Sequence, residues 1–142
     1  MKEARFFDTN ILLYAYSTAE PEKQMACAPL VRKVFEGEMA GVISNQVLGE
    51  FFNAAVSKHI MPANEVAVVI KALIYSAKWQ KVNYTHRTVE GALQHTDGDG
   101  TRFWDLLIAQ TMKENGIKEI LTEDRKGFAG IEGIRITNPF KQ

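Results

Sequence analysis

The chain has 142 residues, in which 17 Lys and Arg balance 17 Asp and Glu, so its formal net charge is zero. This length predicts one domain over residues 1–142, and 46% hydrophobic with 24% charged residues is typical of a globular protein with a single core. The charge balance argues against a polybasic tail or a protein that coats DNA. A nucleic-acid partner is not excluded, because a bound cation can supply positive charge locally.

The single cysteine, Cys27, excludes an internal disulfide bond and a zinc site built from cysteines. We therefore expect an intracellular, cytoplasmic protein. No apolar run approaches the ~18 residues of a membrane span. The short apolar stretch Ile11–Tyr16 follows Asp8, which is untypical of a secretory signal.

Short apolar runs alternate with longer helical patterns along the chain. Strands are predicted at residues 4–8, 41–44, 81–85, 119–122 and 134–137. Helices are predicted at residues 11–17, 21–38, 46–59, 62–78, 86–95 and 101–115. This alternation predicts right-handed crossovers and an α/β sandwich around a central, mainly parallel sheet of about five strands.

Two acidic residues follow predicted strands closely. Asp8 ends the first strand, and Asp124 lies just beyond the fourth. In parallel sheets of this class, the functional crevice lies outside the carboxyl ends of the strands. We therefore expect Asp8 and Asp124 at the same edge of the sheet.

Two further acids lie on apolar helix faces. Glu50 comes three residues after Val47 and four before Ala54, and Asp105 comes three residues before Ile108. A carboxylate on a face that packs against the core is costly unless it is paired or bound to a metal.

Each of these four acids also has an ordinary structural interpretation. Asp8 could cap the following helix, and Asp105 could be a first-turn acid that the helix dipole favours. Glu50 could reach solvent or pair with a buried arginine, and Asp124 could be a turn residue. As a set, however, they would repel one another unless a hard cation such as Mg²⁺ binds them. Such ions can activate water against a phosphodiester bond.

Four segments, taken in order, resemble the acidic motifs of PIN-domain nucleases: Phe6–Asn10, Ser44–Phe51, Phe103–Ala109 and Leu121–Asp124. The length of the chain, without an appended domain, resembles the VapC-type toxins of prokaryotic toxin–antitoxin pairs. This resemblance implies an α/β/α sandwich and an endoribonuclease that depends on Mg²⁺ or Mn²⁺. It also implies an RNA substrate, a homodimer, a cognate antitoxin protein that enters the active-site groove, and no membrane partner.

The resemblance assigns metal binding and catalysis to four acids: Asp8, Glu50, Asp105 and Asp124. It implies that Thr9 or Asn10 helps to orient Asp8 or the substrate, and that Thr122 supports Asp124. The family's last motif often carries another acid two residues after its aspartate, and Lys126 occupies that position here. A first metal site is therefore better supported than a second. The alternative is a catalytically silent PIN-like module that binds RNA or protein.

The Asp-Gly-Asp-Gly-Thr segment at residues 97–101 imitates two other sites. It matches the acidic signature of haloacid-dehalogenase-like phosphatases, but that signature needs a strand directly before it, and residues 92–95 favour a helix end. As an EF-hand loop it lacks the required glycine, replaced by Arg102, and the closing glutamate, replaced by Ile108. We favour a flexible turn in which Thr101 caps the next helix. A loop beside the substrate groove is the lesser alternative.

Residues 51–95 carry a basic surplus, with five Lys or Arg against two Glu. All three histidines lie in this segment, and Tyr75, Trp79 and Tyr84 are interleaved with the charges. The pattern suits an RNA-contacting surface of cations and stacking rings. The alternative is a solvated face with the aromatic rings in the core.

Overall fold

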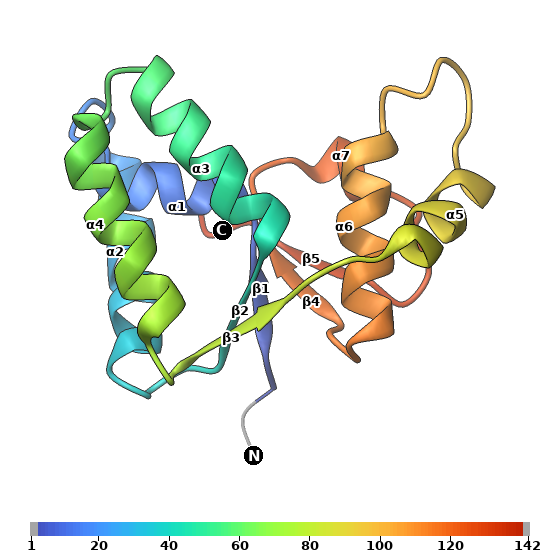
Figure 1. Ribbon diagram of the computed structural model, residues 1–142, viewed down its shortest axis with the longest axis horizontal. Helices are drawn as coiled ribbons and strands as arrows, with labels where there is room; N and C mark the ends of the chain where they lie inside the picture. The colour runs from blue at the N-terminus through green and yellow to red at the C-terminus, as the bar shows by residue number, and fades with distance from the viewer. Residues whose placement is uncertain (1–2, 141–142) are drawn as a thin grey trace.

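The sheet is parallel throughout in the computed structural model, which describes residues 3–140 (Figure 1). Its strands are β1 (Arg5–Phe7), β2 (Gly41–Ser44), β3 (Trp79–Val82), β4 (Glu119–Leu121) and β5 (Arg135–Thr137). They are ordered β3-β2-β1-β4-β5, and every neighbouring pair is parallel. The predicted five-stranded parallel sheet is therefore confirmed, with β1 at its centre.

The described residues also form helices that cover both faces of this sheet. They are α1 (Thr9–Tyr16), α2 (Pro21–Phe35), α3 (Asn45–Ser57), α4 (Ala63–Tyr75), α5 (His86–Gln94), α6 (Phe103–Glu114) and α7 (Arg125–Phe128). Figure 1 shows α1–α4 gathered on one side of the strands and α5–α7 on the other. The predicted α/β/α sandwich is thus confirmed. Within residues 3–140, no helix has both the length and the apolar character needed to cross a bilayer.

The predicted elements overlap the observed ones, with ends that differ by up to three residues. Helix α1 begins at Thr9 rather than residue 11, because Asp8 caps it. Helix α6 begins at Phe103, and Arg102 rather than Thr101 is its N-cap residue, so the predicted Thr101 cap is wrong. The turn before it closes on itself instead, since the Thr101 amide donates to Asp99 Oδ1 at 3.1 Å. The short helix α7 was not expected, because four residues carry no periodic signal.

Strand β3 begins two residues earlier than predicted, at Trp79. Trp79 pairs in register with Gly41 of β2, and a Cβ atom at Gly41 would lie 3.1 Å from the indole ring. The same Cβ atom would lie 2.6 and 2.8 Å from the Val34 methyl groups, so the glycine leaves room for both side chains. The indole packs edge to face on Phe7 with ring centroids 4.9 Å apart. Only 1% of Trp79 is exposed.

For Trp79, the structure contradicts the predicted RNA-contacting surface over residues 51–95 and supports the alternative in which the aromatic ring lies in the core. Tyr84 is half-buried and packs on a small second core cluster of Ala92, Leu106 and Leu107. The Lys81 ammonium group donates to the Ser76 carbonyl at 2.7 Å. Of the three rings, Tyr75 is the exposed one.

The pairing of β1 with β4 determines where the site forms. Phe7 lies opposite Leu121, and the Asp8 amide donates to the Leu121 carbonyl at 3.1 Å. The residues that follow these two strands, Asp8 and Thr122, are therefore neighbours at the carboxyl edge of the sheet.

Candidate active site

The structure brings the four predicted acids together in one groove at the carboxyl edge of the sheet. The groove has a volume of about 410 Å³. It is lined by Asp8, Thr9, Asn10, Leu13, Glu50, Asn53, Ala54, Lys58, Asp105, Ile108 and Asp124. Strand ends supply two of the acids, and helices α3 and α6 supply the other two.

Asp8 is the most deeply buried of the four acids, with 6% of its surface exposed. Its Oδ1 atom accepts the Thr9 amide at 2.8 Å, and its Oδ2 atom accepts the Thr122 hydroxyl at 2.7 Å. Burial raises the pKa of Asp8 to about 6, although both hydrogen bonds act in the opposite direction. The same carboxylate caps α1, so its ordinary structural interpretation holds alongside its place in the groove.

The Thr122 hydroxyl connects three parts of the site. Besides donating to Asp8, its Oγ1 atom accepts the backbone amide of Asp124 at 3.0 Å and the side-chain amide of Asn10 at 3.2 Å. Thr122 thus has the predicted contact with Asp124, and it also holds Asp8, which the sequence did not indicate. Asn10 makes no hydrogen bond to Asp8; its Oδ1 atom accepts the Glu123 amide at 3.2 Å.

Glu50 is held by neutral hydrogen-bond donors. Its Oε1 atom accepts the Thr9 hydroxyl at 2.7 Å, and its Oε2 atom accepts the Gln46 side-chain amide at 3.2 Å. Thr9 therefore orients Glu50 through its hydroxyl group and Asp8 through its backbone amide. No arginine pairs with Glu50 in the part of the chain that the structure describes, so the predicted alternative of a buried Arg partner is wrong.

The carboxylates of Asp105 and Asp124 lie next to each other beside Gly127. Asp105 lies in the first turn of α6, and Asp124 caps α7 by accepting the Gly127 amide at 3.0 Å. Burial raises the pKa of Asp105 to about 7, and the charges of Asp8 and Asp124 together with a hydrogen bond to Asp124 add to the effect. Two carboxyl groups can share a hydrogen bond only when one of them carries a proton.

Gly127 leaves the space that Asp105 and Asp124 occupy. A Cβ atom at this position would overlap Asp105 Oδ2 and would lie 2.7 Å from Asp124 Oδ2. A residue with a side chain would therefore displace one or both carboxylates. The sequence shows this glycine only as part of a polar turn, so its role was missed.

The groove is lined by side chains of the chemical type that binds a divalent cation. Among residues 3–140, no group of three or more His, Cys, Asp or Glu could hold a metal ion in the arrangement that the structure shows. The groove nevertheless offers only carboxylate oxygens as acidic ligands, and two of these carboxyl groups hold a proton at higher pH than usual. A hard cation that takes the place of the protons would relieve the repulsion between the acids.

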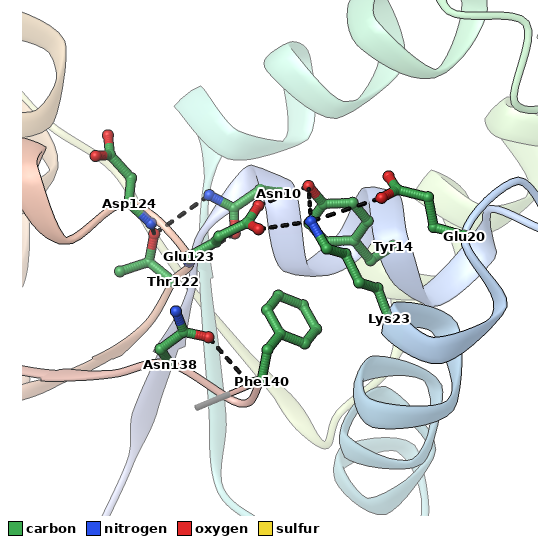
Figure 2. A network of polar contacts seen from close by, with 9 residues as sticks. All are labelled: Asn10, Tyr14, Glu20, Lys23, Thr122, Glu123, Asp124, Asn138 and Phe140. Atoms are coloured by element: carbon green, nitrogen blue, oxygen red, sulfur yellow. Dashed lines mark hydrogen bonds and ion pairs between the residues drawn. The ribbon is translucent and has the colours of Figure 1, made fainter. Parts of the chain in front are cut away.

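A second polar network anchors the turn that carries Asp124 (Figure 2). Glu123 accepts the Lys23 ammonium group at 2.6 Å and the Tyr14 hydroxyl at 2.6 Å. Lys23 also lies 4.5 Å from the centre of the Tyr14 ring and 3.6 Å from Glu20. Side chains of α1 and α2 thus fix the backbone one residue before Asp124. This network joins residues 100 and 109 positions apart, which a sequence pattern does not reveal.

Helical spacing could have identified two neighbours of Glu50: Gln46, which donates to it, and Asn53, which lines the groove. Gln46 lies four residues before Glu50 and Asn53 lies three after it, so all three share one face of α3. Lys58, at the C-cap of the same helix, also lines the groove. It is exposed, and no ion pair is recorded for it within residues 3–140.

The segment 97–101 follows helix α5 and has no strand directly before it, as expected. It therefore lacks the support that a phosphatase nucleophile requires. Asp97 lies 3.9 Å from Arg102 and lines a different cavity of about 360 Å³.

Comparisons with known proteins agree with this architecture. The model of the PIN domain family matches residues 5–133. The structure is similar to VapC20 of Mycobacterium tuberculosis, a toxin that cleaves the sarcin-ricin loop, with a TM-score of 0.68 and 19% identity over 92% of this chain and 98% of that one.

It is also similar to a toxin–antitoxin complex from Klebsiella pneumoniae, with a TM-score of 0.62 and 20% identity over 97% of this chain and 99% of that one. A third similar structure is VapBC2 from Rickettsia felis bound to a promoter DNA fragment, with a TM-score of 0.62 and 18% identity over 95% and 98% of the two chains. No curated protein gives a significant match. Identities this low establish the fold alone, whereas the family model spans most of the chain: this protein belongs to the PIN-domain family.

Proposed function

We propose that this protein is a metal-dependent endoribonuclease that hydrolyses RNA phosphodiester bonds, and that it is the toxin of a cytoplasmic toxin–antitoxin pair. The observation that carries the proposal is the groove in which Asp8, Glu50, Asp105 and Asp124 meet. Support comes from the PIN-domain family match and from the fold, which is similar to those of a VapC toxin that cleaves RNA and of toxin–antitoxin complexes.

The four acids would hold a divalent ion, either Mg²⁺ or Mn²⁺. When bound, such an ion supplies positive charge beside the phosphodiester oxygens and lowers the pKa of a water molecule that can attack the phosphorus atom. Asp8 is hydrogen-bonded through both oxygens, so it faces the groove in a fixed orientation. Glu50 is oriented by neutral donors only, so no cationic side chain competes for its charge.

Lys58 supplies a cation to the same groove. Because no side-chain partner of opposite charge is recorded for it in the described residues, its ammonium group is available to an RNA phosphate. In this proposal the acids act on the scissile phosphodiester, and Lys58 holds the backbone next to it.

The proposal also includes a cognate antitoxin and a homodimer, which follow from the similarity to VapC-type toxins. Sedimentation of the purified chain measures the homodimer directly. Co-purification with the product of an adjacent gene, together with inhibition of RNA cleavage by that product, measures the antitoxin.

The decisive experiment compares the wild-type protein with Asp8→Asn on single-stranded and structured RNA. Asparagine keeps the helix cap and the size of the side chain, so the fold should persist by circular dichroism. We expect cleavage by the wild type with Mg²⁺ or Mn²⁺, none with EDTA, and at least a roughly hundredfold loss in the variant. Asp99→Asn, in the turn before α6, is the matched control and should cleave normally.

Undiminished cleavage by Asp8→Asn would overturn the assignment of the site. A wild-type protein that binds RNA but never cuts it, across both metals and several RNA classes, would favour the alternative of a catalytically silent binding module.

A further inference from the structure

Trp104 exposes a large aromatic ring directly beside the acid groove. It precedes Asp105 at the start of α6, and 56% of its surface is exposed. The only other tryptophan, Trp79, is buried in the core. An indole left in solvent next to a candidate active site requires an explanation that core packing does not provide.

Two observations place Trp104 at the rim of the groove. The Gln46 side-chain amide, which donates to Glu50, also donates to the Trp104 carbonyl at 3.4 Å. Ile108, one helical turn after Trp104 on the same face of α6, lines the groove with the acids. Trp104 itself does not line the groove. Because helical side chains lean toward the N-terminus, we expect its ring to lie just beyond Ile108, at the edge of the groove.

The ring is also supported from behind. It packs edge to face against Phe103, with ring centroids 5.2 Å apart and an interplanar angle of 75°. Phe103 in turn packs on the second core cluster of Ala92, Leu106 and Leu107. This support restricts the rotation of the indole, which lowers the entropy lost when a flat ligand binds it.

We propose that Trp104 is a stacking platform for a nucleobase of the RNA substrate next to the scissile phosphodiester. The inference rests on the proposed ribonuclease function and names how that site holds its substrate. Bases stack on exposed aromatic rings, and a neutral base meets no charge repulsion from the nearby carboxylates, whereas a phosphate would. The base must be unpaired, since a duplex hides its faces.

Helix α3 indicates the path of the strand. Gln46 contacts the backbone of Trp104, Glu50 lies four residues further on, and Lys58 ends the helix on the same groove. At about 1.5 Å per residue, the helix runs roughly 18 Å from Gln46 to Lys58. An extended RNA segment can therefore stack a base on Trp104, present its phosphodiester to the acids, and place a following phosphate at Lys58.

The test uses Trp104→Leu, which keeps apolar bulk but removes the flat ring, and Trp104→Phe, which keeps a ring. With a short RNA that the wild type cleaves, we expect KM to rise about tenfold or more in Trp104→Leu and to stay within about threefold in Trp104→Phe. Tyr75→Leu is the matched control, because Tyr75 is 83% exposed at the end of α4 that leads into the start of β3. That end lies away from the carboxyl edge, so KM should not change.

Fluorescence gives an independent readout, because Trp79 is buried and Trp104 is exposed. In an Asp8→Asn background, which binds without cutting, the same RNA should quench the emission of Trp104. The quenching should disappear in Asp8→Asn/Trp104→Phe.

The outcomes separate the two proposals. Wild-type cleavage with an unchanged KM in Trp104→Leu, or with no quenching, overturns the stacking role and leaves the ribonuclease intact. A wild type that cleaves no RNA overturns the function and the stacking role together. A Trp104→Leu variant whose mass in sedimentation differs from that of the wild type assigns the ring to a contact between two copies of the chain, which also overturns the stacking role.

Discussion

Glu123 and Asp124 are adjacent in the chain, yet they belong to opposite electrostatic environments. Burial would raise the pKa of Glu123, but hydrogen bonds from Lys23 and Tyr14 outweigh it and lower that pKa. Asp124 instead adds its negative charge to a groove in which the pKa of Asp8 is raised to about 6 and that of Asp105 to about 7. The Glu123 carboxylate is paired with Lys23, whereas Asp8 and Asp105 lie among other acids.

This difference separates an acid with a structural role from the acids of the proposed metal site. The Glu123 network is complete within the chain and holds the turn after β4 against α1 and α2 (Figure 2). In the groove, by contrast, burial and the charges of the neighbouring acids raise the pKa of Asp105 to about 7. Such unrelieved repulsion is a known sign of a functional site.

The largest expected effect follows from removing a charge from the groove. Asp105→Asn should lower metal-dependent RNA cleavage at least about a hundredfold, because a ligand that the metal requires is lost. The same change should raise the melting temperature in EDTA at pH 7.5, because it removes a negative charge that the neighbouring acids repel. Paired cleavage and melting assays test both effects. A variant that is both inactive and less stable would show that Asp105 stabilises the fold, contrary to the contrast drawn with Glu123.

Gly127→Ala should damage the groove by steric overlap. The added methyl group would displace the Asp105 and Asp124 carboxylates, with an expected loss of roughly 1–3 kcal/mol in stability. Cleavage should fall at least about tenfold, since catalysis depends on the placement of these acids.

Gly49→Ala is its matched control. Gly49 precedes Glu50 in α3, and a Cβ atom there would meet nothing within 4 Å. Alanine should therefore stabilise the helix by about 0.5–1 kcal/mol and preserve cleavage. Equal behaviour of the two variants would show that Gly127 has no special place beside the acids.

The metal-free protein should lose stability as the pH rises. The pKa values of Asp8 and Asp105 are raised above the ordinary 3.8, so the folded state binds protons more tightly than the unfolded state. Their stabilising effect is complete below about pH 4 and is lost as the pH passes 6 to 7, a change of the order of a few kcal/mol once solvent screening of Asp105 is allowed for. Urea unfolding in EDTA from pH 4 to pH 8 measures this loss of stability. In Asp105→Asn, the free energy of unfolding should depend less on pH.

The smallest effect belongs to the completed network. Glu123→Gln should lower the free energy of unfolding by about 1 kcal/mol or less, because the ion pair between Lys23 and Glu123 is partly exposed. The sign of its pH dependence is opposite, since a lowered pKa stabilises the folded state above the ordinary glutamate range and that stability is lost as the pH falls through the lowered value. Urea unfolding at pH 7 and pH 3 should show a difference between variant and wild type only at the higher pH.

Sequence patterns predicted the parts of this molecule that depend on periodicity. Alternating strands and helices predicted the parallel sheet, and the carboxyl ends of the strands located Asp8 and Asp124. Helical spacing drew attention to Glu50 and Asp105 as acids on apolar faces. These inferences succeeded because each used a short stretch of chain and a general rule of packing.

The features that escaped prediction depend on tertiary contacts. Lys23 and Glu123 meet only because the fold brings the first turn of α2 to the turn that follows β4. For Trp79 the sequence left a surface and a core position open, and the structure places it in the core, where Gly41 on the neighbouring strand leaves room for Val34 and the indole. Gly127 is required only because two distant carboxylates converge on it.

We propose that Asp8, Glu50, Asp105 and Asp124 form one metal-binding centre. Calorimetric titration of Mn²⁺ into the wild type and Asp105→Asn at pH 7.5 tests it most directly, with Glu123→Gln as the control from the compensated network. We predict saturable binding, accompanied by proton release, in the wild type and in Glu123→Gln, and at least about a tenfold weaker affinity in Asp105→Asn. Equal Mn²⁺ affinity in Asp105→Asn and the wild type would contradict the account.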